Sequence, residues 1–190
     1  MSAQIQRRRQ LIDATISEIG RSGSLDVTVG KIAKRAGVSP ALAFHYFGDK
    51  DRLFLAAMRH ILTAYGMDVR AALRGCTGPR ERLESIIRGG FSEANFRSDV
   101  IAAWLNFYVL AHRSPEAQRL LNVYHGRLHS NLVHNLRPLA GEAASPIARR
   151  IAALIDGLYL RYAHFPSDEP EASASAHVMA ALDNELKALA

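Results

Sequence analysis

The sequence predicts an all-α protein of about nine helices, and three observations lead to this fold class. Apolar residues recur at spacings of three and four along most of the chain, which is the pattern of amphipathic helices. Proline marks the expected start of several helices, as in Ser114-Pro115, Ser145-Pro146 and Glu169-Pro170. The sequence contains no alternating strand pattern, no Asn-Gly or Asp-Gly hairpin and no repeat period.

The first 48 residues are expected to form three helices. The first covers residues 4–21, where isoleucines and a leucine follow helical spacing. Thr28 is a good N-cap for a short second helix, which Gly37 ends. Ser39 caps a third helix that reaches residue 47, and Pro40 takes its first helical position, where a missing N–H group costs nothing.

The rest of the chain is expected to form a larger helical bundle. Asp49 caps a long helix from Lys50 to about Arg74, and residues 75–79 interrupt the pattern. Further helices are predicted at 80–96, 98–112, 115–136, 146–163 and 170–188. We therefore expect a small N-terminal domain at residues 1–48 and a larger helical domain at residues 49–190.

Composition and charge restrict the class of protein. The net charge is +6, from 24 Lys and Arg against 18 Asp and Glu, and residues 1–60 carry most of the excess. A basic first third suggests that a polyanion docks there. The single Cys76 cannot form an internal disulfide, and no apolar run approaches the length of a membrane span. With no signal peptide visible either, we expect a cytoplasmic protein without a membrane partner.

Residues 28–47 have the spacing and chemistry of a helix-turn-helix. Gly37 occupies the turn, where a left-handed backbone is needed. In this motif the second helix enters the major groove of double-stranded DNA, and flanking residues contact phosphates. The residues predicted to bind DNA are Thr28, Lys31, Ser39, Pro40, Ala41, Leu42, His45, Tyr46 and Lys50. The alternative is that this helix pair is only scaffold, as in many α-helical proteins.

The residues around this motif resemble a known family. The segment TVGKIAKRAGVSPALAFHYFGDKDRLFLAAM, from Thr28 to Met58, resembles the DNA-binding segment of TetR/AcrR-type transcriptional repressors. One departure is Phe44, where the family more often has tyrosine. A phosphate hydrogen bond from that position is therefore assigned to His45 or Tyr46 instead.

The resemblance extends beyond the DNA-binding segment. Matching stretches of BetI-type regulators are RRRQLIDATI (7–16), AWLNFYVLA (103–111), RLHSNLV (127–133) and LIDGLYLR (154–161). The resemblance implies a repressor of the genes that convert choline to glycine betaine, relieved by choline or a related quaternary ammonium cation. The alternative within the family is a repressor that responds to a different small molecule.

Aromatic residues in the second half supply a candidate ligand site. Rings hold a trimethylammonium group by cation–π attraction, and a nearby carboxylate would balance its charge. The predicted ligand-binding residues are Phe91, Trp104, Tyr108, Asp156 and Tyr159, with Glu93 and Asp99 as weaker carboxylate candidates. The alternative is that the rings fill the core and that Asp156 pairs with Arg149 or Arg161.

The last two predicted helices carry apolar stripes that suggest a homodimer. The residues predicted at the interface are Leu154, Leu158, Val178, Leu182 and Leu186. Pairing of these helices with their copies would form a four-helix bundle, as the family resemblance implies. The alternative is that the stripes pack inside one subunit.

The sequence gives little support for a metal site, a cofactor site or a catalytic site. His125 and His129 share a helix face but lack a third ligand, so we expect no metal site. No nucleophile elbow, phosphate-binding glycine loop or zinc-protease motif is present, and we expect neither a cofactor nor an enzyme. A helical adaptor that does not bind DNA is a further alternative, but it leaves the basic helix-turn-helix unexplained.

Overall fold

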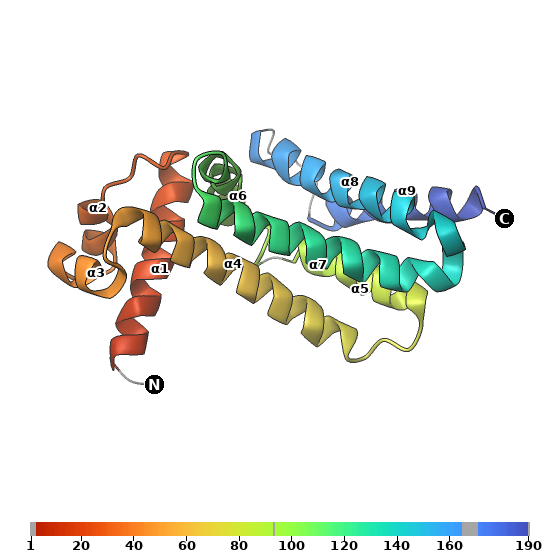
Figure 1. Cartoon of the computed structure of the whole chain (residues 1–190), viewed down its shortest axis with the longest axis horizontal. Helices are drawn as coiled ribbons and strands as arrows, with labels where there is room; N and C mark the ends of the chain where they lie inside the picture. Colours follow the sequence, from red (N-terminus) through yellow and green to blue (C-terminus); the bar gives the residue numbers. More distant parts are fainter. Residues whose placement is uncertain (1–2, 93, 165–170, 190) are drawn as a thin grey trace. The chain divides into compact units, whose positions relative to one another are not determined.

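A computed structural model describes residues 3–92, 94–164 and 171–189 (Figure 1). The described residues contain helices, turns and loops but no strand, which confirms the all-α prediction. The helices are α1 (Ala3–Ser22), α2 (Val29–Arg35), α3 (Pro40–Phe47), α4 (Lys50–Leu73), α5 (Pro79–Gly90), α6 (Ser98–Ala111), α7 (Pro115–Ala140), η1 (Gly141–Ala143), α8 (Ala144–His164) and α9 (Glu171–Lys187). None of the helices described is long and apolar enough to cross a membrane.

The chain divides into two compact units. The first comprises residues 1–63 and 98–121, and the second comprises residues 64–97 and 122–190. The three N-terminal helices therefore form one compact unit together with the start of α4, all of α6 and the start of α7. The expected functional division after residue 48 stays a prediction.

Side-chain caps fix the starts of the N-terminal helices, as predicted. The Thr28 hydroxyl accepts a hydrogen bond from the Lys31 amide at 3.3 Å, and the Ser39 hydroxyl accepts one from the Leu42 amide at 3.2 Å. The Asp49 carboxylate accepts a hydrogen bond from the Arg52 amide at 2.8 Å. Each cap satisfies an amide that has no partner inside its helix, so these boundaries follow from local sequence.

Three predicted helix boundaries are wrong, and one is the end of α7, which reaches Ala140 instead of residue 136 with Pro138 inside it. The helix predicted at 80–96 ends at Gly90, because consecutive glycines weaken a helix and the chain turns at Phe91. After this turn the amides of Asn95 and Phe96 both donate to the Ser92 carbonyl. The helix predicted from residue 146 begins at Ala144 instead, since the turn η1 leads directly into it. The predicted Glu169-Pro170 start signal lies outside the described residues.

The core of the first unit is built around α1. Leu11 and Ile19 of α1 are fully buried, as is Ile32 of α2, and α1 also packs along α6. Leu53 and Phe54 add the first turn of α4 to this core. Burial of such side chains is worth about 1.5–3 kcal/mol each, which is what holds the short helices α2 and α3 in place.

The core of the second unit buries the apolar stripes of α8 and α9 within one chain. Leu158 is 8% exposed, Val178 is fully buried and Leu182 is 1% exposed, whereas Leu154 and Leu186 are half-buried. The argument that these stripes need a second subunit for burial is therefore wrong for Leu158, Val178 and Leu182. They are covered because α9 packs against both α5 and α8.

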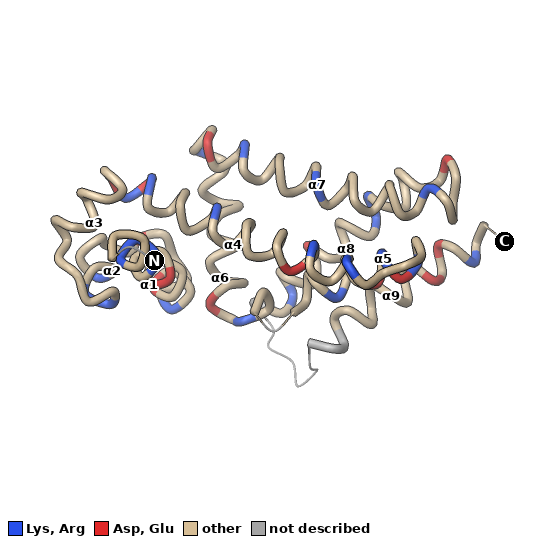
Figure 2. The backbone as a smooth tube through the Cα atoms, turned by 90° about the horizontal axis from the view of Figure 1, so that it is seen from below, with Lys and Arg blue, Asp and Glu red and all other residues tan. Residues whose placement is uncertain are grey.

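Ion pairs reinforce the packing of α9. The Arg80 guanidinium of α5 lies 2.6 Å from the Asp183 carboxylate, and Arg150 of α8 donates to Glu185 at 2.6 Å. Figure 2 marks such basic and acidic positions along the backbone. Both pairs join elements that are distant in sequence, so only the folded chain specifies them.

Candidate DNA-binding surface and ligand site

The turn between α2 and α3 has the backbone geometry of a helix-turn-helix. Gly37 has φ +65°, the left-handed region that only glycine enters at little cost. Its amide donates to the Lys34 carbonyl at 3.2 Å, and the Val38 amide donates to the Ala33 carbonyl at 3.0 Å. These two bonds form a Schellman motif, which ends α2 and directs the chain into α3. Ala33 is fully buried, as a close approach of two helices requires.

The helix α3 has a buried face and an exposed face. Ala43 and Phe47 are buried at 1% and 7% exposure, while Ala41, Phe44 and His45 are exposed. None of the nine residues predicted to bind DNA is buried: Thr28, Lys31, Ser39, Pro40, Ala41 and His45 are exposed, and Leu42, Tyr46 and Lys50 are half-buried. The nine residues belong to one compact unit, although their individual DNA contacts stay predictions.

Arg8 of α1 fixes the C-terminal end of α3. Its Nη1 donates to the Tyr46 carbonyl at 2.7 Å, and its guanidinium carbon lies 4.5 Å from the centre of the Phe47 ring. A cation is favourable at the negative end of a helix dipole and over an aromatic face. Sequence reasoning counted Arg8 only as part of the basic charge, because its partner is a backbone carbonyl of another helix.

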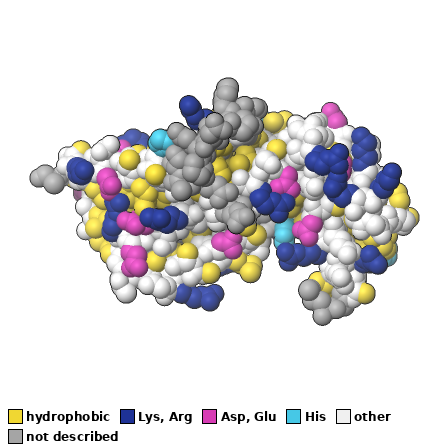
Figure 3. Space-filling view, turned by 180° about the vertical axis from the view of Figure 1, so that it is seen from behind, with side chains coloured by type: hydrophobic (Ala, Val, Ile, Leu, Met, Phe, Trp, Pro, Cys, Tyr) yellow, Lys and Arg dark blue, Asp and Glu magenta, His cyan; other side chains and the backbone are white. Residues whose placement is uncertain are grey.

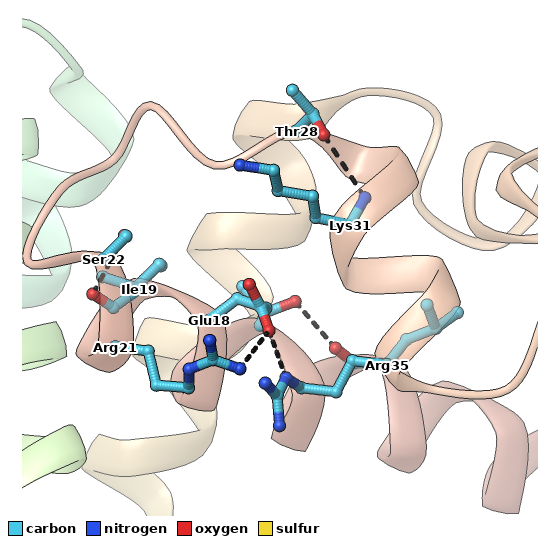
Figure 4. Close-up of polar contacts among 9 residues, drawn as sticks. Glu18, Ile19, Arg21, Ser22, Thr28, Lys31 and Arg35 are labelled. Atoms are coloured by element: carbon cyan, nitrogen blue, oxygen red, sulfur yellow. Dashed lines mark hydrogen bonds and ion pairs between the residues drawn. The ribbon is translucent and has the colours of Figure 1, made fainter.

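Glu18 neutralises part of the basic charge of this unit. Its carboxylate pairs with Arg35 of α2 and lies 3.7 Å from Arg21 of α1 (Figure 4). The Glu18 side chain is only 14% exposed, so the ion pair with Arg35 ties α2 to α1. Arg21 and Arg35 are thus engaged within the protein, whereas Lys31 is exposed beside them. Basic and acidic side chains are also interspersed on the face that Figure 3 shows.

Lys50 stands at the first position of α4, as predicted. Its Nζ lies 5.2 Å from the centre of the Phe54 ring, one turn further along the same helix. The ammonium group and the positive end of the α4 dipole therefore lie together. This combination favours an anion such as a DNA phosphate.

Two of the five predicted ligand residues join an aromatic cluster in the second unit. Phe91 and Tyr159 stack at 5.5 Å between ring centres, and Phe96 meets both rings edge-on at 5.4 Å. Tyr162 packs against Phe96 at 5.0 Å. The Tyr159 hydroxyl donates to the Gly90 carbonyl, and burial raises the pKa of this hydroxyl far above its usual value. The cluster is a well-packed group of rings with one buried polar anchor.

Asp156 lies in the same unit, beside tyrosines and a histidine. Its Oδ1 atom is buried, and its Oδ2 atom is 3.7 Å from Nε2 of His125. Burial and, to a smaller extent, the negative charge of Asp156 together raise the pKa of Tyr65 to about 12. The same charge contributes to the raised pKa of Tyr159. Asp156 is therefore a carboxylate whose charge acts on the hydroxyl groups of two tyrosines.

Tyr124 connects this group to α7. Its ring meets the Tyr65 ring edge-on at 5.8 Å and lies 5.2 Å from the His125 ring. Sequence reasoning missed Tyr65 and Tyr124 and considered His125 only for zinc. Helical spacing could not bring them together with Asp156, because they come from three different helices. The described residues contain no group of three potential metal ligands, and His129 lies 3.5 Å from the Ser145 hydroxyl.

Trp104 and Tyr108 form a separate pair on α6. Their rings meet edge-on at 5.6 Å, and Trp104 is 6% exposed. Both belong to the first compact unit, whereas Phe91, Asp156 and Tyr159 belong to the second. A single cage made of all five residues stays a prediction. Of the weaker candidates, Asp99 is half-buried in the first turn of α6, and Glu93 lies outside the described residues.

Comparison with known proteins decides the family. Residues 11–57 match the model for "Bacterial regulatory proteins, tetR family", and residues 79–187 match the model for "BetI-type transcriptional repressor, C-terminal". The chain is 54% identical over 170 residues to the HTH-type transcriptional regulator BetI of Brucella suis biovar 1, which covers 89% of this chain and 85% of that protein. It is 46% identical over 182 residues to the BetI regulator of Agrobacterium fabrum, covering 95% and 88% of the two chains. The chain belongs to the BetI-type repressors of the TetR family.

Solved structures of transcriptional regulators share this fold. A putative transcriptional regulator from Pseudomonas aeruginosa PAO1 superposes with a TM-score of 0.76 at 26% identity, covering 96% of this chain and 91% of that one. A regulator from Saccharomonospora viridis in complex with choline has a TM-score of 0.84 at 22% identity, with 94% and 96% covered. The second likeness shows the fold alone.

Membership of the TetR family gives the helix-turn-helix its function. This BetI-type repressor is a DNA-binding transcriptional regulator, and α2 and α3 lie within the matched DNA-binding segment. This function replaces the alternative of a helical adaptor that does not bind DNA. The comparisons leave the individual contact residues, the effector and the assembly to be argued from the geometry.

Proposed function

We propose that this BetI-type repressor controls genes for the conversion of choline to glycine betaine, and that choline or a related quaternary ammonium cation relieves the repression. The match of residues 79–187 to the BetI-type C-terminal model supports the pathway. The choline complex of the Saccharomonospora viridis regulator supports the class of effector. The protein acts in the cytoplasm, where its operator is, as a regulator and not as an enzyme.

The observation that carries the effector assignment is that Asp156 is partly buried in the same unit as Tyr65 and Tyr159 and raises the pKa of both. A quaternary ammonium group has no N–H to donate, so its recognition depends on ring faces and on a negative charge. A half-buried carboxylate next to tyrosines supplies both, and Asp156 is one-third exposed. The partly buried position also strengthens the attraction, because solvent screens it less than at the surface.

Ligand binding relieves repression only if it favours a state that binds the operator poorly. The cation must therefore bind this state more tightly than the operator-binding state. By linkage, operator DNA then weakens choline binding by the same factor. Choline affinity measured with and without a bound DNA duplex tests this reciprocity.

Titration calorimetry with choline and 3,3-dimethyl-1-butanol tests the effector. The alcohol has the same shape but no charge, so we expect it to bind much more weakly than choline. Asp156→Asn should weaken choline binding by about tenfold or more. Tyr65→Leu should weaken it by roughly two- to thirtyfold, the range for one ring of cation–π contact. Glu142→Gln changes an exposed carboxylate of the same unit and should leave the affinity unchanged.

The possible outcomes test the assignment of the effector separately from the assignment of the regulated pathway. Equal affinity for choline and the alcohol would mean that the site selects shape and not charge. If neither binds, the effector is a different small molecule, which is the alternative within the family. Trp104→Leu tests the α6 residues in the same way: a loss of choline affinity would add Trp104 to the site.

The repressor is proposed to act as a homodimer through α8 and α9. Leu158, Val178 and Leu182 are covered inside one chain, while Leu154 and Leu186 are half-buried, and the exposed faces left for a partner contain small and apolar residues. Ala153, Gly157 and Leu160 are exposed on α8, and Ala176 and Ala180 are exposed on α9. Small side chains permit the close helix approach of a four-helix bundle. A symmetric dimer requires an operator with inverted half-sites.

A further inference from the structure

Phe44 is an exposed aromatic side chain in the helix that reads DNA. It is 48% exposed, and within α2 and α3 no other large hydrophobic side chain is exposed to this degree. The neighbouring Ala43 and Phe47 are both buried in the core of the unit. The Phe44 side chain is therefore accessible to a partner that binds the exposed face of α3.

The orientation of Phe44 is fixed by contacts at both ends of α3. Ser39 caps the N-terminus, and Arg8 holds the Tyr46 carbonyl and the Phe47 ring at the C-terminus. Phe47 is held in the core, whereas Phe44 is exposed together with Ala41 and His45. Residues 41, 44 and 45 are separated by three and four positions, so they share one helix face.

The chemistry of Phe44 restricts what it can contact on DNA. A phenyl ring has no group that can hydrogen-bond a phosphate or a polar base edge. The apolar feature of the major groove is the C5-methyl group of thymine, and phenylalanine is among the side chains suited to contact it. The adjacent Ala41 is small and apolar, so it extends this patch without blocking access to the groove.

We propose that Phe44 is a specificity-determining residue that contacts thymine methyl groups in the major groove. This inference rests on the DNA-binding function of the family and adds what the exposed face of α3 reads. It makes thymine the preferred base at the positions beneath Phe44 in each half-site. The phosphate contacts fall to the polar and basic residues around it.

Replacement of thymine by deoxyuridine tests the proposal. Duplexes that bind the full-length protein are first selected from a random-sequence pool, and each thymine is then replaced in turn. Deoxyuridine keeps every hydrogen-bonding group and removes only the methyl group. We expect about a fourfold loss of affinity for each methyl group that Phe44 contacts. Phe44→Ala should bind the thymine and deoxyuridine duplexes equally well.

Three control variants make the result specific. Phe44→Tyr keeps the ring and should keep the preference for thymine. Val109→Ala removes a 58% exposed apolar side chain from α6 and should also keep it. Phe44→Leu removes the ring but keeps a bulky apolar side chain, so it controls for an effect of the truncation in Phe44→Ala on folding. It should retain part of the preference for thymine.

Several outcomes would overturn the proposal. One is a protein whose affinity does not change with deoxyuridine at any position. Another is a Phe44→Ala variant that still prefers thymine, or one that loses affinity for all duplexes alike, since this would indicate a contact with the sugar-phosphate backbone. Failure to select any sequence would overturn both this inference and operator binding itself.

Discussion

Gly20 of α1 lies so close to Asp99 of α6 that a Cβ atom at position 20 would be 2.5 Å from the Asp99 Cα atom. The Asp99 Cβ atom would be equally close and the Asp99 carbonyl oxygen 2.7 Å away; the backbone and the Cβ attached to it cannot move aside as the end of a flexible side chain can. The absence of a side chain at Gly20 therefore sets how closely the first helix of the DNA-binding unit packs on α6. Both helices belong to the same compact unit.

Gly20→Ala should destabilise the protein because the new methyl group overlaps the backbone of α6. Overpacking of this kind costs about 1–3 kcal/mol. Gly126→Ala is the matched control, since Gly126 is also helical but has open space around its Cβ position. That control should stabilise the protein by up to about 1 kcal/mol. Urea unfolding measures both, and a Gly20→Ala variant as stable as the parent would refute the close-packing argument.

Lys50→Ala should weaken binding to operator and to unrelated DNA alike, because a phosphate contact carries no base information. The slope of log affinity against log salt should become shallower by about one unit for one lost phosphate contact. Lys187→Ala removes the same charge from the last turn of α9 and should leave the slope unchanged. Fluorescence anisotropy at several salt concentrations gives the slopes, and an unchanged slope for Lys50→Ala would exclude it as a phosphate ligand.

His60 should make the first unit less stable in mild acid. Burial lowers the pKa of His60 below 6.5, the Arg9 charge lowers it further, and Asp13, 3.8 Å away, opposes the shift. As the pH falls below about 6.5 the unfolded chain takes up this proton before the folded chain does, so the free energy of unfolding decreases. The free energy of unfolding therefore has its full value above about pH 6.5 and decreases as the pH falls through the lowered pKa of His60.

His60→Gln should therefore reduce the loss of thermal stability between about pH 7.5 and pH 5.5. His112→Gln replaces an exposed histidine of the same unit and serves as the control. Melting temperatures followed by circular dichroism give the comparison. An identical pH dependence in the parent and in His60→Gln would show that His60 takes up its proton equally well in both states.

Ala153→Arg should convert the proposed dimer into folded monomers, because Ala153 is exposed on α8 and a large charged side chain there blocks close helix approach. Leu182→Arg should instead unfold the chain, since Leu182 is 1% exposed within one subunit and an unpaired buried charge costs several kcal/mol. Ala71→Arg, on the exposed surface of α4, is the control. Sedimentation velocity together with circular dichroism distinguishes monomer from unfolded chain; an intact Ala153→Arg dimer would place the interface elsewhere.

The sequence by itself determined the features of this protein that depend on near neighbours in the chain. The caps at Thr28, Ser39 and Asp49 and the left-handed turn at Gly37 each involve residues only a few positions apart. Local hydrogen bonds and backbone preferences are therefore enough to predict the helix-turn-helix, and its residue pattern was enough to indicate the family.

Only the tertiary structure decided which partner each side chain meets across the fold. An apolar stripe shows that a helix face is buried, but not whether its own chain or a second copy covers Leu158 and Leu182. In the same way, nothing in the sequence assigns His125 to Asp156 or Arg8 to the carbonyl of Tyr46. These contacts join different helices, and they exist because core packing brings helices that are distant in the sequence next to each other.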